Sequence, residues 1–293
     1  MTRYVFTPAA ETLIPIVGND AYFPVRRIYC VGRNYAEHAR EMGSDPNREP
    51  PFFFSKPRDA IVARGGVIPF PPATTNLQHE VELVVAIGKG GADIPEADAL
   101  THVYGYATGI DFTRRDLQTQ AREKCHPWEL GKGMEFGAPI SEIRPLSAGY
   151  PAGEAQIWLK VNDEIRQSSR LNQMTWNVPE IINRLSHFFE LAPGDLIFTG
   201  TPAGVGIGVP GPVDFQAGVP VAPPRVQTPT LHVAAAPRVV CPRMAMEDPL
   251  VILMGMAYRM APPLPLFAFQ SSACPTSAGA SSWSPSSCWP KAR

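Results

Sequence analysis

The chain has 293 residues, 44% of them hydrophobic, and its formal net charge is −1 because 26 basic residues nearly balance 27 acidic ones. This length allows one large domain or two small ones, and the composition allows a sizeable core. The balanced charge excludes a strongly basic protein, so we expect neither nucleic acid nor an anionic membrane as a partner.

The five cysteines follow neither a zinc-binding spacing nor that of a small disulfide framework. We therefore predict free thiols and a cytoplasmic location. The N-terminus lacks the basic and apolar segments of a signal peptide. The longest apolar stretch, 249–269, contains Arg259 and four prolines, so we predict no membrane span.

Strand-like and helical patterns alternate along the first 213 residues. Short apolar runs between turn residues predict strands at 27–31, 52–55, 81–87, 103–110, 157–161 and 196–199. We expect helices at 34–42, at 113–124 with Thr113 as N-cap, and at 179–190. Asn162-Asp163 indicates a hairpin turn between strands.

The character of the sequence changes after about Val213. Pro, Ala and Ser dominate, charges are sparse, and no strand or helix periodicity persists. We therefore predict a lead-in at 1–20, a compact domain at 21–213, and a tail at 214–293 that is disordered. One hypothesis for the tail is translation from a shifted reading frame, which resequencing the 3′ end of the gene would test.

Carboxylates form the strongest candidate site. Glu80 and Glu82 are two residues apart in a strand-like run, so their side chains would share one face. Asp111 follows another apolar run. Three carboxylates without His or Cys favour a hard divalent ion such as Mg²⁺, Mn²⁺ or Ca²⁺. The alternative is that the glutamates lie on a solvated strand face.

Three further motifs carry polar groups. His38 and Glu41 share a helix face, where a carboxylate beside His favours a general base. Arg115 and Gln118 are also three apart and suit a bound carboxylate, and Lys132 lies between glycines. The Gly-rich loop 199–206 offers backbone N–H groups to an anion. The alternative for the His38–Glu41 and Arg115–Gln118 pairs is an exposed helix face. The alternative for Lys132 is a surface loop, and for the Gly-rich loop a plain turn.

The order of these motifs resembles the fumarylacetoacetate hydrolase family. The similar segments are CVGRNY at 30–35, FSKP at 54–57, HEVEL at 79–83, GYATGID at 105–111, RDLQ at 115–118, WLKVN at 158–162 and TGTPAGVG at 199–206. They span about residues 20 to 210, and their joint order is highly specific.

The resemblance implies an α+β fold with a mixed, β-rich core, rolled like a sandwich or barrel and flanked by short helices. It implies a homodimer whose Glu80, Glu82 and Asp111 bind the metal. It also implies that His38 and Glu41 handle a proton of the nucleophilic water or of the substrate. The groups that it places near the substrate are Lys132, Arg115, Gln118, the backbone at Thr201 and Lys56.

Segment 105–118 looks closest to fumarylpyruvate and acylpyruvate hydrolases. We therefore expect an enzyme that uses Mg²⁺ or Mn²⁺ to cleave a C–C bond in a small 2,4-dioxo acid, with fumarylpyruvate giving fumarate and pyruvate in aromatic-compound catabolism. The alternatives are an oxaloacetate decarboxylase or a hydroxy-diene-dioate isomerase or decarboxylase. A further alternative is an inactive remnant, because the strand pair that completes the core in relatives is not recognisable beyond residue 210.

Overall fold

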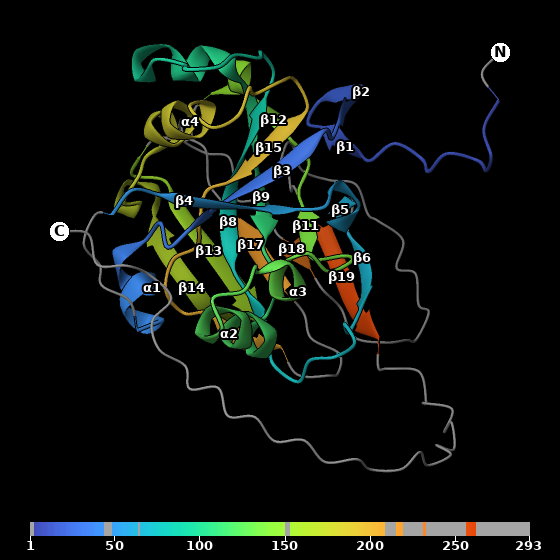
Figure 1. Cartoon of the computed structure of the whole chain (residues 1–293), viewed down its shortest axis with the longest axis vertical. Helices are drawn as coiled ribbons and strands as arrows, with labels where there is room; N and C mark the ends of the chain where they lie inside the picture. Colours follow the sequence, from blue (N-terminus) through green and yellow to red (C-terminus); the bar gives the residue numbers. More distant parts are fainter. Residues whose placement is uncertain are drawn as a thin grey trace, which may run out of the picture.

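A computed structural model describes residues 3–43, 49–63, 65–149, 153–208, 215–218, 231–232 and 256–261. Its centre is a curled mixed sheet (Figure 1). The strands across this sheet are β4 (Phe52–Lys56), β3 (Arg27–Gly32), β15 (Asp195–Phe198), β8 (Val81–Ile87), β9 (Val103–Ile110), β11 (Ala138–Ile140) and β5 (Ile61–Ala63), and β12 (Arg144–Pro145) also pairs with β9. Pairs β3–β15 and β11–β5 are parallel, and the others are antiparallel.

Smaller sheets surround this centre in the described part of the chain. They are β1 (Leu13–Ile16) with β2 (Asn19–Pro24); β7 (Leu77–His79) between β10 (Thr113–Arg114) and β16 (Gly206–Gly208); β13 (Gln156–Val161) between β14 (Glu164–Arg170) and β17 (Phe215–Gly218); and β19 (Met256–Ala261) between β18 (Leu231–His232) and β6 (Gly66–Pro69).

The helices are short. They are α1 (Ala36–Glu41), α2 (Arg115–Glu123), α3 (Glu129–Lys132) and α4 (Val178–Ser186), with 3-10 turns at Arg58–Ala60, Glu96–His102, Leu146–Ala148 and Leu171–Gln173. In Figure 1, α1, α2 and α3 lie toward one end of the molecule and α4 toward the other. The predicted α+β class, with a mixed β-rich core and short flanking helices, is confirmed.

Strand β8 explains why the core has two sides. All seven of its residues are buried, so its sequence is apolar almost throughout. Alternate residues join different hydrophobic clusters: Leu83 and Val85 pack in one, and Val84 and Ala86 pack in the other. Glu82 has the same parity as Val84, and it therefore continues the face of the second cluster as a carboxylate.

The predicted elements agree with these strands, but two helix ends were wrong. Thr113 is not an N-cap: it belongs to β10, where it pairs with Gln78, and its buried hydroxyl donates to Asp111 O at 3.3 Å. Helix α4 ends at Ser186 rather than at 190, and the N–H groups of Phe188 and Phe189 both donate to Leu185 O in an irregular last turn.

The predicted hairpin turn is confirmed. Asn162 and Asp163 both have positive φ, 49° and 66°, and they connect the antiparallel strands β13 and β14. Two left-handed residues give a turn whose twist matches that of the paired strands, and Asn and Asp tolerate this conformation better than most residues.

Parts of the predicted lead-in and tail are strands. Strand β1 lies within 1–20, and Ile14 and Ile16 are buried. In the tail, β17 pairs antiparallel with β13, and β19 pairs parallel with both β18 and β6. The rest of the predicted tail lies outside the described residues, so its disorder and its shifted frame stay predictions.

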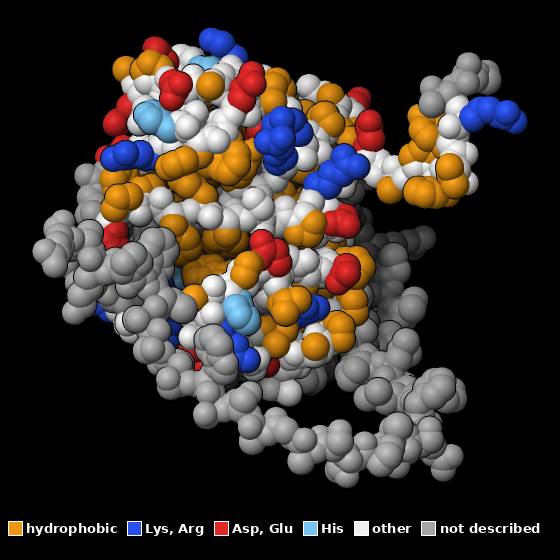
Figure 2. Space-filling view, viewed as in Figure 1, with side chains coloured by type: hydrophobic (Ala, Val, Ile, Leu, Met, Phe, Trp, Pro, Cys, Tyr) orange, Lys and Arg blue, Asp and Glu red, His pale blue; other side chains and the backbone are white. Residues whose placement is uncertain are grey.

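The surface carries charges of both signs. On the face seen in Figure 2, acidic and basic side chains are interspersed with apolar ones, as the balanced charge leads one to expect. Within the described residues, none of the helices has the length and apolar character needed to cross a bilayer.

Candidate active site

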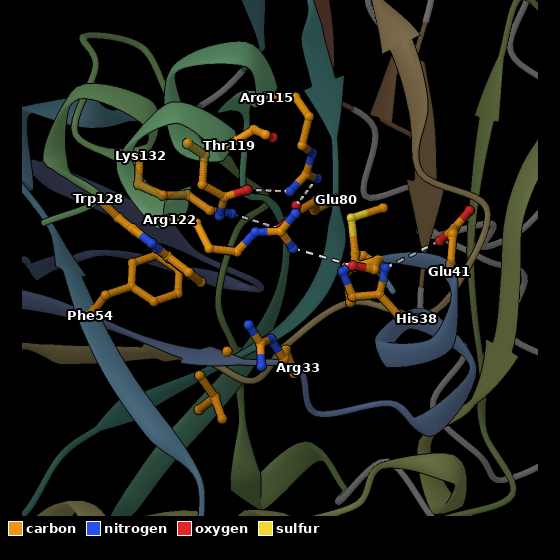
Figure 3. A pocket seen from close by; sticks show the side chains of 15 residues that line it. Arg33, His38, Glu41, Phe54, Glu80, Arg115, Thr119, Arg122, Trp128 and Lys132 are labelled. Carbon is orange, nitrogen blue, oxygen red and sulfur yellow. Dashed lines mark hydrogen bonds and ion pairs between the residues drawn. The ribbon is translucent and has the colours of Figure 1, made fainter. Parts of the chain in front are cut away.

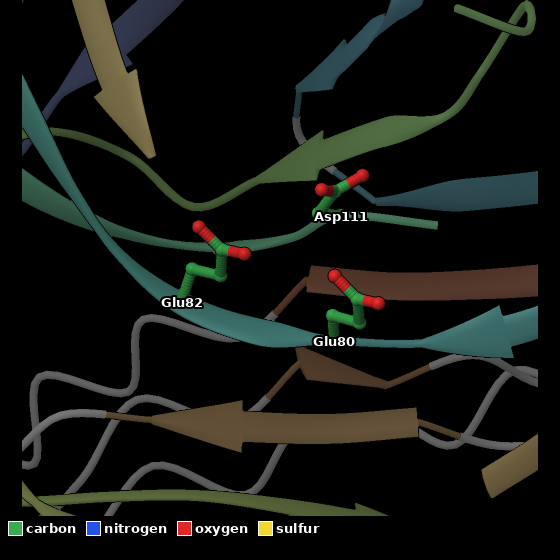
Figure 4. A group of neighbouring side chains, drawn as sticks. All are labelled: Glu80, Glu82 and Asp111. Atoms are coloured by element: carbon green, nitrogen blue, oxygen red, sulfur yellow. The ribbon is translucent and has the colours of Figure 1, made fainter. Parts of the chain in front are cut away.

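Glu80, Glu82 and Asp111 converge below the surface (Figure 4). All three are buried, and one carboxylate oxygen from each lies within 4.8 Å of the others. The β8–β9 ladder produces this arrangement, because it sets Glu82 opposite Gly109 and continues with Asp111 N–H donating to Glu80 O at 2.8 Å. Glu80 comes just before the first residue of β8. It still lies on the same side as Glu82, because the two residues are two positions apart in extended chain.

Two glycines lie beside this acid cluster of Glu80, Glu82 and Asp111. A Cβ at Gly109 would lie 2.6 Å from the ring of Phe198, so that ring can pack where a side chain would otherwise stand. Gly200 has φ +94°, and its N–H donates to Glu82 Oε2 at 2.7 Å. The loop after β15 therefore requires glycine for its backbone conformation and uses it to approach a carboxylate.

The surrounding charges shift the pKa values of Glu80 and Glu82 in opposite directions. Burial, together with Asp111 and Glu80, raises the pKa of Glu82 well above its usual range. Burial also raises the pKa of Glu80, but Lys132 and Arg115 outweigh it and hold that pKa well below its usual range. Buried carboxylates this close repel each other unless a proton or a cation lies between them.

Lysines and an arginine face the acid cluster. Lys132 Nζ lies 2.7 Å from Glu80 Oε2 and 2.6 Å from Asp111 Oδ2, and these carboxylates outweigh the effect of burial and raise its pKa. Arg115 contacts Glu80 and Gln118, and its Nε donates to Gln78 at 2.6 Å. Arg115 and Gln118 therefore lie together, as their spacing predicted.

Asp111 keeps an acceptor free of hydrogen bonds. Lys56 Nζ lies 2.9 Å from its Oδ1, but outside hydrogen-bond geometry, and donates instead to the backbone oxygens of Phe112 and Lys132. This buried oxygen and a donor set made of carboxylates alone fit a hard divalent cation with oxygen ligands. Among the described residues, the acid cluster is the one group in which three His, Cys, Asp or Glu side chains lie close enough together to bind a single metal ion.

His38 and Glu41 form the expected pair on α1. His38 Nδ1 lies 3.2 Å from Glu41 Oε2, and His38 is buried. The hydrogen bond from His38 and one from Gly204 N–H lower the pKa of Glu41. A carboxylate facing Nδ1 orients the ring and leaves Nε2 as the nitrogen available for proton transfer.

One pocket of about 250 Å³ joins these groups (Figure 3). Of the ten predicted site residues, those that line it are His38, Glu41, Glu80, Arg115, Gln118, Lys132 and Thr201. Glu82, Asp111 and Lys56 do not line it, although they contact or neighbour residues that do. The structure therefore brings the predicted residues into one region.

Sequence reasoning missed several residues of this region. Gln167 of β14 is buried; its Oε1 accepts from Val81 N–H at 3.0 Å and its Nε2 donates to Thr201 Oγ1 at 2.8 Å. Burial lowers the pKa of His79, which also contacts Gln167 Oε1, to about 4. Asn34 lies within a quoted motif but was given no role; its side chain donates to Thr199 O at 2.7 Å.

Four more residues that line the pocket had no predicted part. They are Arg33, Phe54, Arg122 and Trp128. Arg33 and Phe54 lie within quoted motifs but were given no role, whereas Arg122 and Trp128 lie outside those motifs.

A mixed, curled sheet that carries a buried acid cluster beside a His–Glu pair has the side chains that a metal-assisted enzyme needs. Comparison with known protein families identifies the class more closely. The family described as fumarylacetoacetate (FAA) hydrolase C-terminal matches residues 27–239. The chain therefore belongs to the fumarylacetoacetate hydrolase family, whose members include hydrolases of carbon–carbon bonds, and the expected enzyme class is confirmed.

Individual relatives place the chain near one branch. It is 47% identical over 167 residues to the fumarylpyruvate hydrolase of Ralstonia sp, covering 57% of this chain and 86% of that protein. The solved fumarylpyruvate hydrolase of Pseudomonas aeruginosa, in complex with Mn²⁺ and pyruvate, is 50% identical with a TM-score of 0.72, over 74% of this chain and 94% of that one. The mitochondrial oxaloacetate tautomerase of Homo sapiens is 42% identical over 181 residues, 62% of this chain and 81% of that protein.

Proposed function

We propose that the chain is a divalent-metal hydrolase of 2,4-dioxo acids and that fumarylpyruvate, cleaved to fumarate and pyruvate, is its substrate. The observation that supports this proposal best is the meeting of the acid cluster, the His38–Glu41 pair and the Arg115–Gln118 pair around one pocket. The similarity to fumarylpyruvate hydrolases of two bacteria supports the choice of substrate.

Glu80, Glu82 and Asp111 would hold the ion, which we propose to be Mg²⁺ or Mn²⁺, with Ca²⁺ as an alternative. When bound, the ion supplies a Lewis acid for the oxygens of the 2-oxo acid. Arg115 and Gln118, which lie together beside Glu80, bind the adjacent carboxylate of the substrate.

His38 takes a proton from a water molecule at Nε2, while Glu41 holds the ring by its Nδ1 side. The hydroxide adds to the C4 carbonyl, and Lys132 faces the oxyanion that develops there. The C3–C4 bond then breaks, so that C4 leaves as a carboxylic acid. The proton held by His38 returns to C3, and the sum is the addition of water across that bond.

A substrate panel tests the proposal. The purified chain would be assayed with Mg²⁺ and with Mn²⁺ on fumarylpyruvate, a simple acylpyruvate, oxaloacetate and a hydroxy-diene-dioate. We expect cleavage of fumarylpyruvate with the highest kcat/KM. Turnover of oxaloacetate without turnover of acylpyruvates would contradict the proposal and favour the oxaloacetate-acting relatives. Absence of turnover on every substrate would support the inactive remnant.

We also propose that the protein is a homodimer, that it is cytoplasmic and that it takes part in aromatic-compound catabolism. Size-exclusion chromatography with light scattering tests the first of these directly, since a mass near twice 31.9 kDa is expected.

A further inference from the structure

Two cations of the pocket have no part in the chemistry above. Arg33, in the turn between β3 and α1, and Arg122, on α2, both line the pocket and are exposed. Among the described residues, neither guanidinium lies within ion-pair distance of a carboxylate, whereas Arg115 and Lys132 are each paired with Glu80. The pocket therefore holds two positive charges beyond those that the acid cluster neutralises. We name Arg33 and Arg122 the rim arginines.

A row of aromatic rings leads from the acid cluster to Arg33. Lys132 Nζ lies 5.1 Å from the ring centroid of Phe54, whose ring lies 5.7 Å from that of Trp128. Trp128 meets Phe52 edge-on at 5.2 Å, and Arg33 Cζ lies 5.5 Å above the Phe52 ring. Phe54 and Trp128 also line the pocket, so its wall between Lys132 and Arg33 is apolar and aromatic.

Arg122 reaches the same space from the other side. Its side chain extends from α2, and Nη1 donates to Met42 O, at the end of α1, at 3.2 Å. Figure 3 shows Arg122 and Arg33 flanking the middle of the pocket, between the Phe54–Trp128 side and His38. Both guanidinium groups are therefore near the path that a ligand would take away from the acid cluster.

The backbone of Arg33 is a second observation. Its φ is 57°, in the left-handed region that disfavours most residues with a Cβ atom. Gly or Asn would adopt this conformation more readily. An arginine in this position is thus disfavoured locally, which is expected where its charge has a use.

We propose that the rim arginines bind the distal carboxylate of a dicarboxylic acylpyruvate whose unsaturated chain lies against Phe54 and Trp128. The inference rests on the proposed function and identifies the residues that would make the enzyme prefer a substrate with a second carboxylate. With the 2-oxo acid end at the acid cluster, the conjugated carbons of fumarylpyruvate extend away from it and end in a second carboxylate. Arginines suit that carboxylate, because a guanidinium donates two parallel hydrogen bonds to it.

A substrate without that carboxylate leaves the rim arginines unpaired. Crotonylpyruvate has the same chain with a methyl group in place of the distal carboxylate, and so it is the matched partner of fumarylpyruvate. Wild-type protein should prefer fumarylpyruvate in kcat/KM by roughly 10-fold or more, because a charge-assisted hydrogen bond is made with one substrate only.

The test compares both substrates in wild-type protein and in five variants with Mn²⁺ present. Arg33→Asn suits the left-handed backbone, and Arg122→Gln removes an exposed charge, so both should keep the melting temperature of the wild type. Each should lower the preference for fumarylpyruvate by roughly 10-fold. Lysine at either position should restore part of it. Arg40→Gln is the control, since Arg40 is exposed on α1 but does not line the pocket, and it should leave the preference unchanged.

The outcomes separate the two proposals. If wild-type protein cleaves both acylpyruvates but Arg33→Asn and Arg122→Gln change the two kcat/KM values by the same factor or not at all, the subsite is wrong and the hydrolase proposal stands. If wild-type protein cleaves neither, the proposed function fails and the subsite fails with it. A loss of preference in Arg40→Gln as large as in the rim variants would show long-range attraction instead of binding at a subsite.

Discussion

Gln167→Met should destabilise the fold and loosen the acid cluster at the same time. The Gln167 side chain is buried and makes contacts on both sides: Val81 N–H and His79 on one, Thr201 and Pro202 O on the other. Methionine has a similar length and no amide, so it fills the space without these bonds. The change therefore removes one of the links between the start of β8 and the Gly-rich loop, and leaves the hydrogen bond from Thr201 Oγ1 to Val81 O.

The size of the effect follows from the groups left without partners. Val81 N–H and Pro202 C=O each lose a buried hydrogen bond, and an unsatisfied buried group costs about 1–3 kcal/mol. The sum is about 2–6 kcal/mol out of the ~5–15 kcal/mol by which domains are usually stable. Denaturant unfolding of metal-free protein measures it, and a thermal melt with Mn²⁺ measures the response to metal.

The metal response should fall because Val81 lies between two of the proposed ligands and the loop supplies Gly200 N–H to Glu82. Gln156→Met is the matched control: Gln156 is exposed on β13 and bonds Ser168 at 2.7 Å, so the free energy of unfolding should change by less than about 0.5 kcal/mol. If Gln167→Met were as stable as this control, or kept the full rise of melting temperature with Mn²⁺, the positioning argument would be refuted.

Three other substitutions test the roles of single groups. Glu82→Ala should abolish the rise of melting temperature with Mn²⁺; an unchanged rise would show that Glu82 is not a ligand. His38→Ala should keep that rise but lower kcat by roughly 10²–10⁴-fold, as loss of a general base does; full activity would exclude the role. Glu41→Gln removes a carboxylate of lowered pKa, whose stabilisation is complete above the ordinary pKa near 4.5 and is lost as pH falls through the lowered folded value. The free energy of unfolding of wild-type protein should thus exceed that of Glu41→Gln by less than about 1 kcal/mol at pH 7, because Glu41 is about a third exposed. This margin should shrink as pH falls through the lowered pKa; a margin that grew at low pH would contradict the sign.

The parts of the fold that sequence predicted well are those set by uninterrupted burial. The predicted strands 81–87 and 103–110 match β8 and β9 to the residue, because a strand buried on both faces is a continuous apolar run. The predicted start of α4 at 179 is within one residue of the observed start at Val178, since Pro179 lies in the first turn, and the structure adds a capping box of Asn177 and Glu180.

The parts that were mispredicted depend on distant partners. Thr113 has the chemistry of an N-cap, yet pairing of β10 with β7 draws it into a strand. Gln167 is a buried residue in a largely exposed and polar strand, so nothing local marks it as facing inward. Its partners lie more than 30 residues away in sequence, and only the fold brings them together.

The sequence indicated which residues belong to the candidate site, but it did not indicate how their side chains are arranged. Spacing indicated that Glu80 and Glu82 share a face, and their burial favours the metal hypothesis over a solvated strand face. The approach of Lys132 to Asp111 was not predictable, because α3 and β9 meet only in the folded chain. The rim arginines went unnoticed for the same reason.

The most direct test of the account is the place of the ion. Crystals of the purified chain grown with Mn²⁺ would be measured at the manganese absorption edge, and the anomalous signal would be mapped. We expect one strong peak within bonding distance of carboxylate oxygens of Glu80, Glu82 and Asp111. A peak elsewhere, or ordered carboxylates with no peak among them at saturating Mn²⁺, would contradict it.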